Sequence, residues 1–174
     1  MKRISNPRCC FLITSLAFTG ATAQFVPVEP TGLPYHIIVS SVLINGVPAI
    51  EGTEIGVFDD TLCVGTGIIA GENENIDIVT WEGSYSPYLP GFTAGNPINV
   101  KVYVDIYSTM LTLDAQPDFE VGSGLFGSGS YSVLGLAVST PPVQTQDIPD
   151  ISIVEDSGPD TTLIALNDHF THPY

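Results

Sequence analysis

The feature that most constrains the fold is a series of short apolar runs separated by turn-forming residues. The clearest run is Ile98 to Tyr107, in which apolar residues alternate with Asn, Lys, Tyr and Asp. A period of two places apolar side chains on one face of a strand and polar side chains on the other. The other runs of strand length are 36–44, 47–50, 54–58, 62–69, 76–81 and 131–138.

Turn signals separate these runs. Asn45-Gly46 is the strongest short hairpin signal, and Asp59-Asp60-Thr61 forms a second hairpin-like turn. No window of useful length has the apolar period of an amphipathic helix. We therefore predict an all-β protein, namely an antiparallel β-sandwich of the immunoglobulin-like or jelly-roll-like kind with about seven to nine strands.

The first 23 residues have the parts of a secretory signal peptide. Lys2, Arg3 and Arg8 form a basic segment before the apolar stretch 9–18, and Ala21-Thr22-Ala23 offers small residues for cleavage before Gln24. The apolar stretch is shorter than the roughly 20 residues that a membrane-spanning helix needs. We expect a secreted or cell-surface protein with no membrane insertion after signal cleavage. An uncleaved anchor is the alternative.

The charge of the chain excludes several classes of partner. The sequence has 4 Lys and Arg against 19 Asp and Glu, a net charge of −15. Removal of the signal peptide leaves Lys101 as the single basic side chain against all 19 acids. A nucleic-acid binder needs clustered cations that displace counterions from phosphate, so we expect no nucleic acid as partner. Binding to an anionic membrane surface is excluded for the same reason.

The chain divides into four segments. Residues 1–23 are the signal peptide and residues 24–138 the predicted β-sandwich domain. Residues 139–147, which contain Pro141-Pro142, are a linker. Residues 148–174 are too few to fold alone, so they are expected to be the incomplete start of a second domain in a longer protein. Pairing of this segment with something else is the alternative.

Two features that resemble catalytic motifs have simpler explanations. Cys63 lies between apolar residues, as a small buried hydrophobe does, whereas a reactive thiol needs a His partner and an electropositive setting. The segment Gly122 to Gly127 matches G-x-G-x-x-G, but no helix follows it to bind a phosphate, so we expect a flexible loop. No acid–base constellation shares one context, and we predict that the protein is not an enzyme.

Two acidic turns are candidates for calcium. Asp59 and Asp60 occupy one turn, while Glu72, Glu74 and Asp77 lie in and beside another. Calcium prefers closely spaced oxygen ligands of this type, and it would neutralise part of the charge. The alternative is that both turns are exposed and solvated, with counter-ions taken from the medium.

A cluster of aromatic residues is the candidate ligand site. Trp81, Tyr85, Tyr88 and Phe92 fall within a short Gly- and Pro-rich segment, together with Glu82. Exposed rings on a loop could stack on a sugar or a peptide, and the carboxylate could accept hydrogen bonds from it. The alternative is that Trp81 and Phe92 close the end of the core.

Two sequence blocks carry a resemblance to a known group of proteins. They are Gly52 to Gly65 (GTEIGVFDDTLCVG) and Gly91 to Ile98 (GFTAGNPI). The chain resembles β-sandwich modules of secreted multidomain bacterial surface proteins, especially those exported by the type IX secretion system of Bacteroidota. The resemblance implies an extracellular location and a sandwich architecture.

The segment 148–174 resembles the opening of a cadherin-like or immunoglobulin-like tandem repeat. Such repeats continue with an acidic F-x-D-P-D motif associated with calcium, whereas His172 and Tyr174 stand at the matching positions here. We expect a non-enzymatic module of a larger protein that acts in adhesion or as a structural spacer. The alternative is a carbohydrate-binding module attached to a downstream polysaccharide-active enzyme. The expected partner is an extracellular glycan or protein, with calcium as a candidate cofactor.

Overall fold

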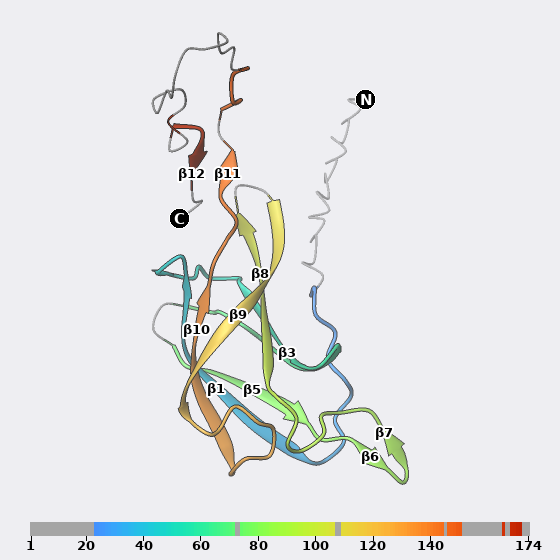
Figure 1. The fold of residues 1–174 in the computed structure, drawn as a ribbon. Helices are drawn as coiled ribbons and strands as arrows, with labels where there is room; N and C mark the ends of the chain where they lie inside the picture. Colours follow the sequence, from blue (N-terminus) through green and yellow to red (C-terminus); the bar gives the residue numbers. More distant parts are fainter. Residues whose placement is uncertain are drawn as a thin grey trace, which may run out of the picture.

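Strands dominate the structure. The computed structural model describes residues 23–71, 74–106, 109–144, 146–150, 165 and 168–171, and these ranges contain no α-helix (Figure 1). The predicted all-β class is therefore confirmed. The strands in chain order are β1 (Pro34–Ile44), β2 (Val47–Pro48), β3 (Glu54–Asp59), β4 (Leu62–Ile68), β5 (Ile76–Trp81), β6 (Ser84–Tyr85), β7 (Tyr88–Leu89), β8 (Asn99–Ile106), β9 (Thr109–Val121), β10 (Tyr131–Val138), β11 (Val143–Gln144) and β12 (Phe170–Thr171).

Most strands belong to one eight-stranded mixed sheet. Its order is β2-β1-β10-β9-β8-β3-β4, and β5 also pairs with β1. β1 and β10 run parallel, from His36 opposite Tyr131 to Ile44 opposite Val138. The expectation of a wholly antiparallel sheet is wrong at this pair. Apolar runs predict strands but not which distant strands meet, and here the whole chain between β1 and β10 serves as the crossover that a parallel pair requires.

The two ends of the sheet approach each other because β4 has glycines where it faces β5. A Cβ atom on Gly65 would lie 2.8 Å from Cγ2 of Thr80, and one on Gly67 would lie 2.8 Å from Cγ2 of Ile76. Two backbones come this close only where no side chain separates them. The sheet is thus curled (Figure 1). β4, the last strand in the order, packs against β5, which pairs with β1 near the opposite end.

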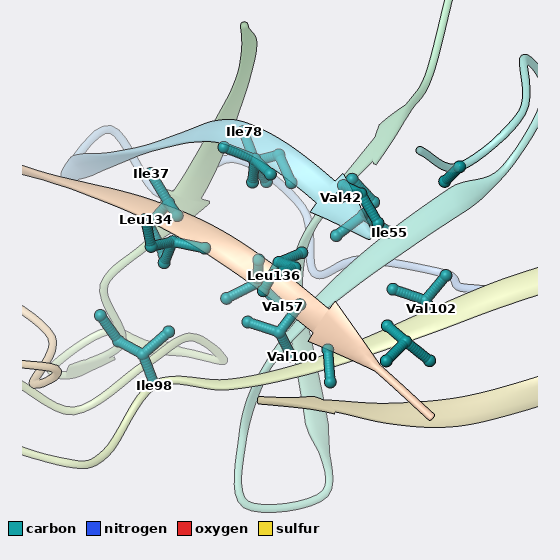
Figure 2. Close-up of a cluster of buried hydrophobic side chains, with 14 of the residues drawn as sticks. Ile37, Val42, Ile55, Val57, Ile78, Ile98, Val100, Val102, Leu134 and Leu136 are labelled. Carbon is teal, nitrogen blue, oxygen red and sulfur yellow. The ribbon is translucent and has the colours of Figure 1, made fainter. Parts of the chain in front are cut away.

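The core fills the inside of this curl. The predicted face of β8 is confirmed: Val100, Val102, Val104 and Ile106 are buried, while Asp105 is exposed. Apolar side chains from β1, β3, β4, β5, β8, β9 and β10 converge there, which removes them from water and stabilises the fold. Figure 2 shows part of this cluster. The labelled members of this cluster are Ile37, Val42, Ile55, Val57, Ile78, Ile98, Val100, Val102, Leu134 and Leu136.

β9 was not predicted from the sequence. It pairs with β8 on one side and β10 on the other, so it connects the two halves of the sheet. Its burial alternates, but the inward face is only partly buried: Leu111, Leu113 and Phe119 pack on the core only partly, and Pro117 lies on the same face. A proline within a run of mixed polarity argues against a central strand, which is why this run carried no signal.

The predicted linker is attached to structure at both ends. Asn45, at the β1–β2 turn, donates from Nδ2 to Oγ1 of Thr140 at 2.6 Å and accepts at Oδ1 from the Thr140 N–H at 3.0 Å. Asn45 and Gly46 both have positive φ, as the predicted tight hairpin turn requires. Further on, β11 pairs with β12, so that Gln144 lies opposite Phe170.

Candidate functional site

The aromatic segment forms a small hairpin that projects from the sheet (Figure 1). β6 and β7 pair so that Tyr85 lies opposite Tyr88. Its base is closed by two hydrogen bonds, from the Gly83 N–H to the Phe92 carbonyl at 2.9 Å and from the Phe92 N–H to the Trp81 carbonyl at 2.8 Å. The hairpin is therefore anchored at its base by β5.

Gly91 is required at the base of the hairpin. A Cβ atom at this position would collide with the main-chain oxygen of Trp81, and it would lie 2.6 Å from the carbonyl carbon of Glu82. These neighbours are backbone atoms, which cannot move aside as a flexible side chain can. The sequence G-F at positions 91–92 thus lets the returning chain pass directly beside the end of β5.

The two hairpin tyrosines are exposed. Tyr85 is 90 % exposed, the highest value of any large apolar residue among those described, and Tyr88 is 76 % exposed. Residues directly opposite each other on an antiparallel pair have side chains close together. The structure therefore presents two neighbouring aromatic side chains to solvent at the end of a projecting hairpin.

The other aromatic candidates do not share this surface. Phe92 is 2 % exposed, and its ring stacks on that of Phe126 with 4.6 Å between ring centroids. The Phe92 ring also packs edge-to-face with the Tyr35 ring, with 5.9 Å between ring centroids. Trp81 is half-buried on β5, opposite Pro34. Phe92 thus closes the end of the core, as the alternative interpretation described, and its ring is not available to a ligand.

Glu82 connects the hairpin to the segment before β1. Its N–H donates to the Leu33 carbonyl at 3.0 Å, and its carbonyl accepts from Oγ1 of Thr31 at 2.7 Å. The residue is half-buried and lines a surface cavity of about 540 Å³ together with both exposed tyrosines. Glu82, Tyr85 and Tyr88 therefore border one hollow, which extends to Leu62 and Ala94.

The first acidic turn is part of the hydrogen-bonded frame. Both carboxylate oxygens of Asp59 accept hydrogen bonds: Oδ2 from the Thr93 N–H at 2.8 Å, and both from Nδ2 of Asn96 at 2.8 and 3.0 Å. Asp60, the next residue, is exposed and has a positive φ of 54°. A calcium ion at this turn would compete with protein donors for Asp59.

The second acidic turn lies beside β5. Glu72 lies outside the described residues, and Glu74 is exposed. Asp77 approaches Nδ1 of His36 at 3.0 Å, with both side chains largely in solvent. Within the described ranges, no group of three or more His, Cys, Asp and Glu side chains is arranged to hold a metal ion.

Cys63, on β4, is buried with aromatic neighbours that include residues of β3 and β8. It packs with Phe25 and Phe58, and Tyr103 borders the same cluster. Burial raises the pKa of the Cys63 thiol, and the nearby Glu54 carboxylate raises it further, while the hydrogen bond to the Gly65 carbonyl lowers it. Because the thiolate is the nucleophilic form, this environment opposes nucleophilic reactivity.

The glycine-rich loop between β9 and β10 is fixed to the structure rather than free. The Phe126 N–H donates to the Asn96 carbonyl at 2.9 Å, the Gly95 N–H donates to the Phe126 carbonyl at 2.8 Å, and the Ile98 N–H donates to the Gly124 carbonyl at 2.9 Å. Phe126 is 1 % exposed. The expectation of a flexible loop is therefore wrong, because the loop covers one end of the core. Phe126 was the signal in the sequence that could have indicated this.

Comparison with protein-family models, with curated proteins and with solved structures finds no match for this chain. In the part of the chain that the structure describes, no helix has the length and apolar character needed to cross a membrane.

Proposed function

We propose that the chain is a non-enzymatic extracellular β-sandwich module of a larger protein, and that it acts in adhesion through the β6–β7 hairpin. The observation that carries this function is the exposure of Tyr85 and Tyr88 at 90 % and 76 % on a projecting hairpin. Tyrosine combines a large apolar ring with a polar hydroxyl, and it is enriched where proteins contact their partners. Burial of both rings against a partner would stabilise a contact without any change in the sheet.

The sandwich architecture is part of this proposal. The approach of β4 to β5 at Gly65 and Gly67 supports two facing layers, since it brings strands from opposite ends of the sheet order into direct contact. Apolar residues from both halves of the sheet fill the space between these layers. A sandwich of this kind holds its loops at the two ends of the layers, which suits recognition by a projecting hairpin.

A carbohydrate-binding module is the second candidate, and the cavity beside the hairpin favours it. The cavity of about 540 Å³ is lined by Glu82, Tyr85 and Tyr88. Aromatic faces stack on sugar rings, and a carboxylate accepts hydrogen bonds from sugar hydroxyls. In this case the chain would direct a downstream polysaccharide-active enzyme to its substrate.

The experiment measures attachment of beads that carry the processed chain. The surfaces are immobilised cellulose, xylan and chitin, and a gelatin-coated surface. We expect attachment to at least one surface, and we expect the double variant Tyr85→Ser and Tyr88→Ser to lose it. Tyr131→Ser is the matched control, because Tyr131 is an exposed tyrosine on β10.

Two outcomes would contradict the proposed role of the hairpin. One is attachment that the double variant retains, and the other is no attachment to any of the surfaces. Competition by soluble oligosaccharides with attachment to a polysaccharide surface would favour the carbohydrate-binding candidate. Attachment to gelatin that oligosaccharides do not inhibit would favour adhesion to protein.

A further inference from the structure

Glu54 is a buried carboxylate that binds the beginning of the described chain. The residue is 5 % exposed, although it lies at the start of β3. Its Oε2 accepts a hydrogen bond from the Gln24 N–H at 2.8 Å, and its Oε1 accepts one from the Phe25 N–H at 2.9 Å. Both oxygens of the side chain are thus directed to two consecutive main-chain nitrogens.

No basic side chain balances this carboxylate in the described ranges. Lys101 is the only Lys or Arg in them, and its Nζ lies 3.3 Å from Oδ1 of Asp114 and 5.8 Å from the centre of the Phe58 ring. A buried charge is costly unless an opposite charge and hydrogen bonds compensate it. Glu54 has the hydrogen bonds but lacks a cation.

The Phe25 side chain fixes the position of the Gln24 and Phe25 main-chain nitrogens. The Phe25 ring packs edge-on against Phe58, with 5.4 Å between centroids, and against Tyr103, with 6.4 Å between centroids. Gly56 leaves the space for this ring, since a Cβ atom there would lie 2.7 Å from Cδ2 of Phe25. The anchored ring therefore holds the main chain of Gln24 beside Glu54.

A cavity lies at the same place. It has a volume of about 400 Å³, and its lining includes Ala23, Glu51, Thr53, Glu54 and Asp105. Three of these residues are acidic, which attracts a positive charge. Thr53 is 2 % exposed, and its buried hydroxyl oxygen has no hydrogen-bond partner in the described part of the chain. An unpartnered buried hydroxyl and three carboxylates suit a cationic donor in this cavity.

We infer that Glu54 is the binding site for the α-ammonium group that cleavage before Gln24 creates. In the uncleaved chain the Gln24 nitrogen is a neutral amide. Cleavage turns the same atom into an ammonium group within hydrogen-bond distance of the carboxylate, and a charge-assisted hydrogen bond is shorter and stronger than a neutral one. Signal removal thus provides the cation that the buried carboxylate lacks, and the mature fold is completed by processing.

This inference depends on the predicted cleavage site and not on the adhesive function. The first test is therefore the N-terminus of the exported protein, read by N-terminal sequencing and intact mass. We expect Gln24 as the first residue, with a free α-amine. A different first residue, or a terminus that lacks the amine, would overturn the inference.

The second test is a double-mutant cycle between the terminus and the carboxylate. Four proteins are compared by urea unfolding at neutral pH: chains that begin at Gln24 or retain Ala23, each with Glu54 or with Glu54→Gln. Retention of Ala23 moves the ammonium group one residue away. We expect it to lower the folding equilibrium constant about tenfold in the Glu54 chain and less than about twofold in the E54Q chain.

Glu29→Gln is the matched control, because Glu29 is an exposed acid near the same terminus that does not line this cavity. It should leave the effect of Ala23 retention unchanged. Equal effects of Ala23 in the Glu54 and E54Q chains would overturn the inference.

A third measurement needs only the wild-type protein, so it remains informative even if the E54Q protein folds poorly. An N-terminal glutamine can cyclise: the neutral α-amine attacks Cδ of its own side chain and a C–N bond forms. A proton passes from the amine nitrogen to Nε2, the Cδ–Nε2 bond breaks, and ammonia leaves. An amine held protonated against Glu54 has no free electron pair for this attack. We expect the folded wild-type chain to lose ammonia from Gln24 at least about tenfold more slowly than the urea-unfolded chain, and equal rates would contradict the inference.

Discussion

Two loops of similar composition lie at one end of the sheet and meet through a pair of stacked rings. The β6–β7 hairpin and the β9–β10 loop are both rich in Gly and Ser, and each contains at least one aromatic residue. In the hairpin, Tyr85 and Tyr88 are exposed to solvent. In the loop, Phe126 is buried and stacks on Phe92, the residue that closes the base of the hairpin.

The difference comes from the backbone. The Phe126 N–H donates to the Asn96 carbonyl, and the Phe126 carbonyl accepts from the Gly95 N–H. These bonds direct the ring into the core. Among the described residues, the hairpin backbone is hydrogen-bonded within itself and at its base, and both tyrosines near its tip are exposed. Local composition thus does not decide whether a ring stabilises the fold or faces a partner, whereas attachment of the backbone to the sheet does.

The largest expected effect is at the buried ring. Phe126→Ala should lower the free energy of unfolding by about 3–5 kcal/mol, because it leaves a cavity beside Phe92. Urea unfolding measures this change. Leu125→Ala is the matched control, since Leu125 is partly exposed on the same loop, and it should cost far less. Equal losses for both variants would remove the distinction between the two loops.

A smaller loss is expected at the base of the hairpin. Gly91→Ala should destabilise the fold by about 1–3 kcal/mol, because its methyl group collides with the main chain of Trp81 and Glu82. Thermal unfolding and bead attachment should both be measured, since displacement of the base would also move the tyrosines. Ser86→Ala, at the exposed tip, serves as the control. A Gly91→Ala protein with unchanged melting temperature would contradict the structure at this contact.

The β3–β4 turn at Asp59 and Asp60 should contribute less to the free energy of unfolding. Asp59→Ala removes the acceptor for the Thr93 N–H and the Asn96 side chain, with an expected loss of about 1 kcal/mol. Asp60→Ala should have little effect, because Asp60 is exposed. Each protein is melted with calcium and with magnesium. The melting temperature of the wild type could instead rise in calcium but not in magnesium. If Asp60→Ala abolished that rise, the turn would bind a calcium ion.

The smallest change in stability is expected at the tyrosines themselves. The double variant Tyr85→Ser and Tyr88→Ser should unfold within about 0.5 kcal/mol of the wild type, because both rings are exposed. Differential scanning calorimetry measures this directly. A loss as large as that of Phe126→Ala would show that the hairpin rings support the fold and are not held for a partner.

The sequence pattern predicted strands well and their partners poorly. β5 and β10 have the bounds that the apolar runs indicated, and the inward face of β8 was correct. Strand propensity and alternation are local properties, so a single sequence contains them. The parallel pairing of β1 with β10 depends on contacts between distant segments, and β9 was hidden by Pro117 and by acidic residues on its exposed face.

The candidate site could be compared with the structure only in part. The sequence suggested exposed rings on a loop, and Tyr85 and Tyr88 are exposed, while ligand binding by them stays a prediction. The separate environment of Phe92 could not be predicted, since it depends on Phe126, far away in the sequence. Glu54 also gave no signal, because a single acid in a strand is commonly exposed, and only the fold places it beside Gln24.

The parallel pairing of β1 and β10 has a mechanical consequence. The chain enters the sheet at the start of β1 and leaves it at the end of β10, and these two points lie at opposite ends of one parallel ladder. Tension between them therefore pulls the two strands along each other and loads the ladder hydrogen bonds together, whereas an antiparallel hairpin pulled from its open end breaks its bonds one after another. A chain fixed to a surface at one side and to a partner at the other would resist separation through this ladder, which single-molecule force measurements can compare with the β1–β2 hairpin.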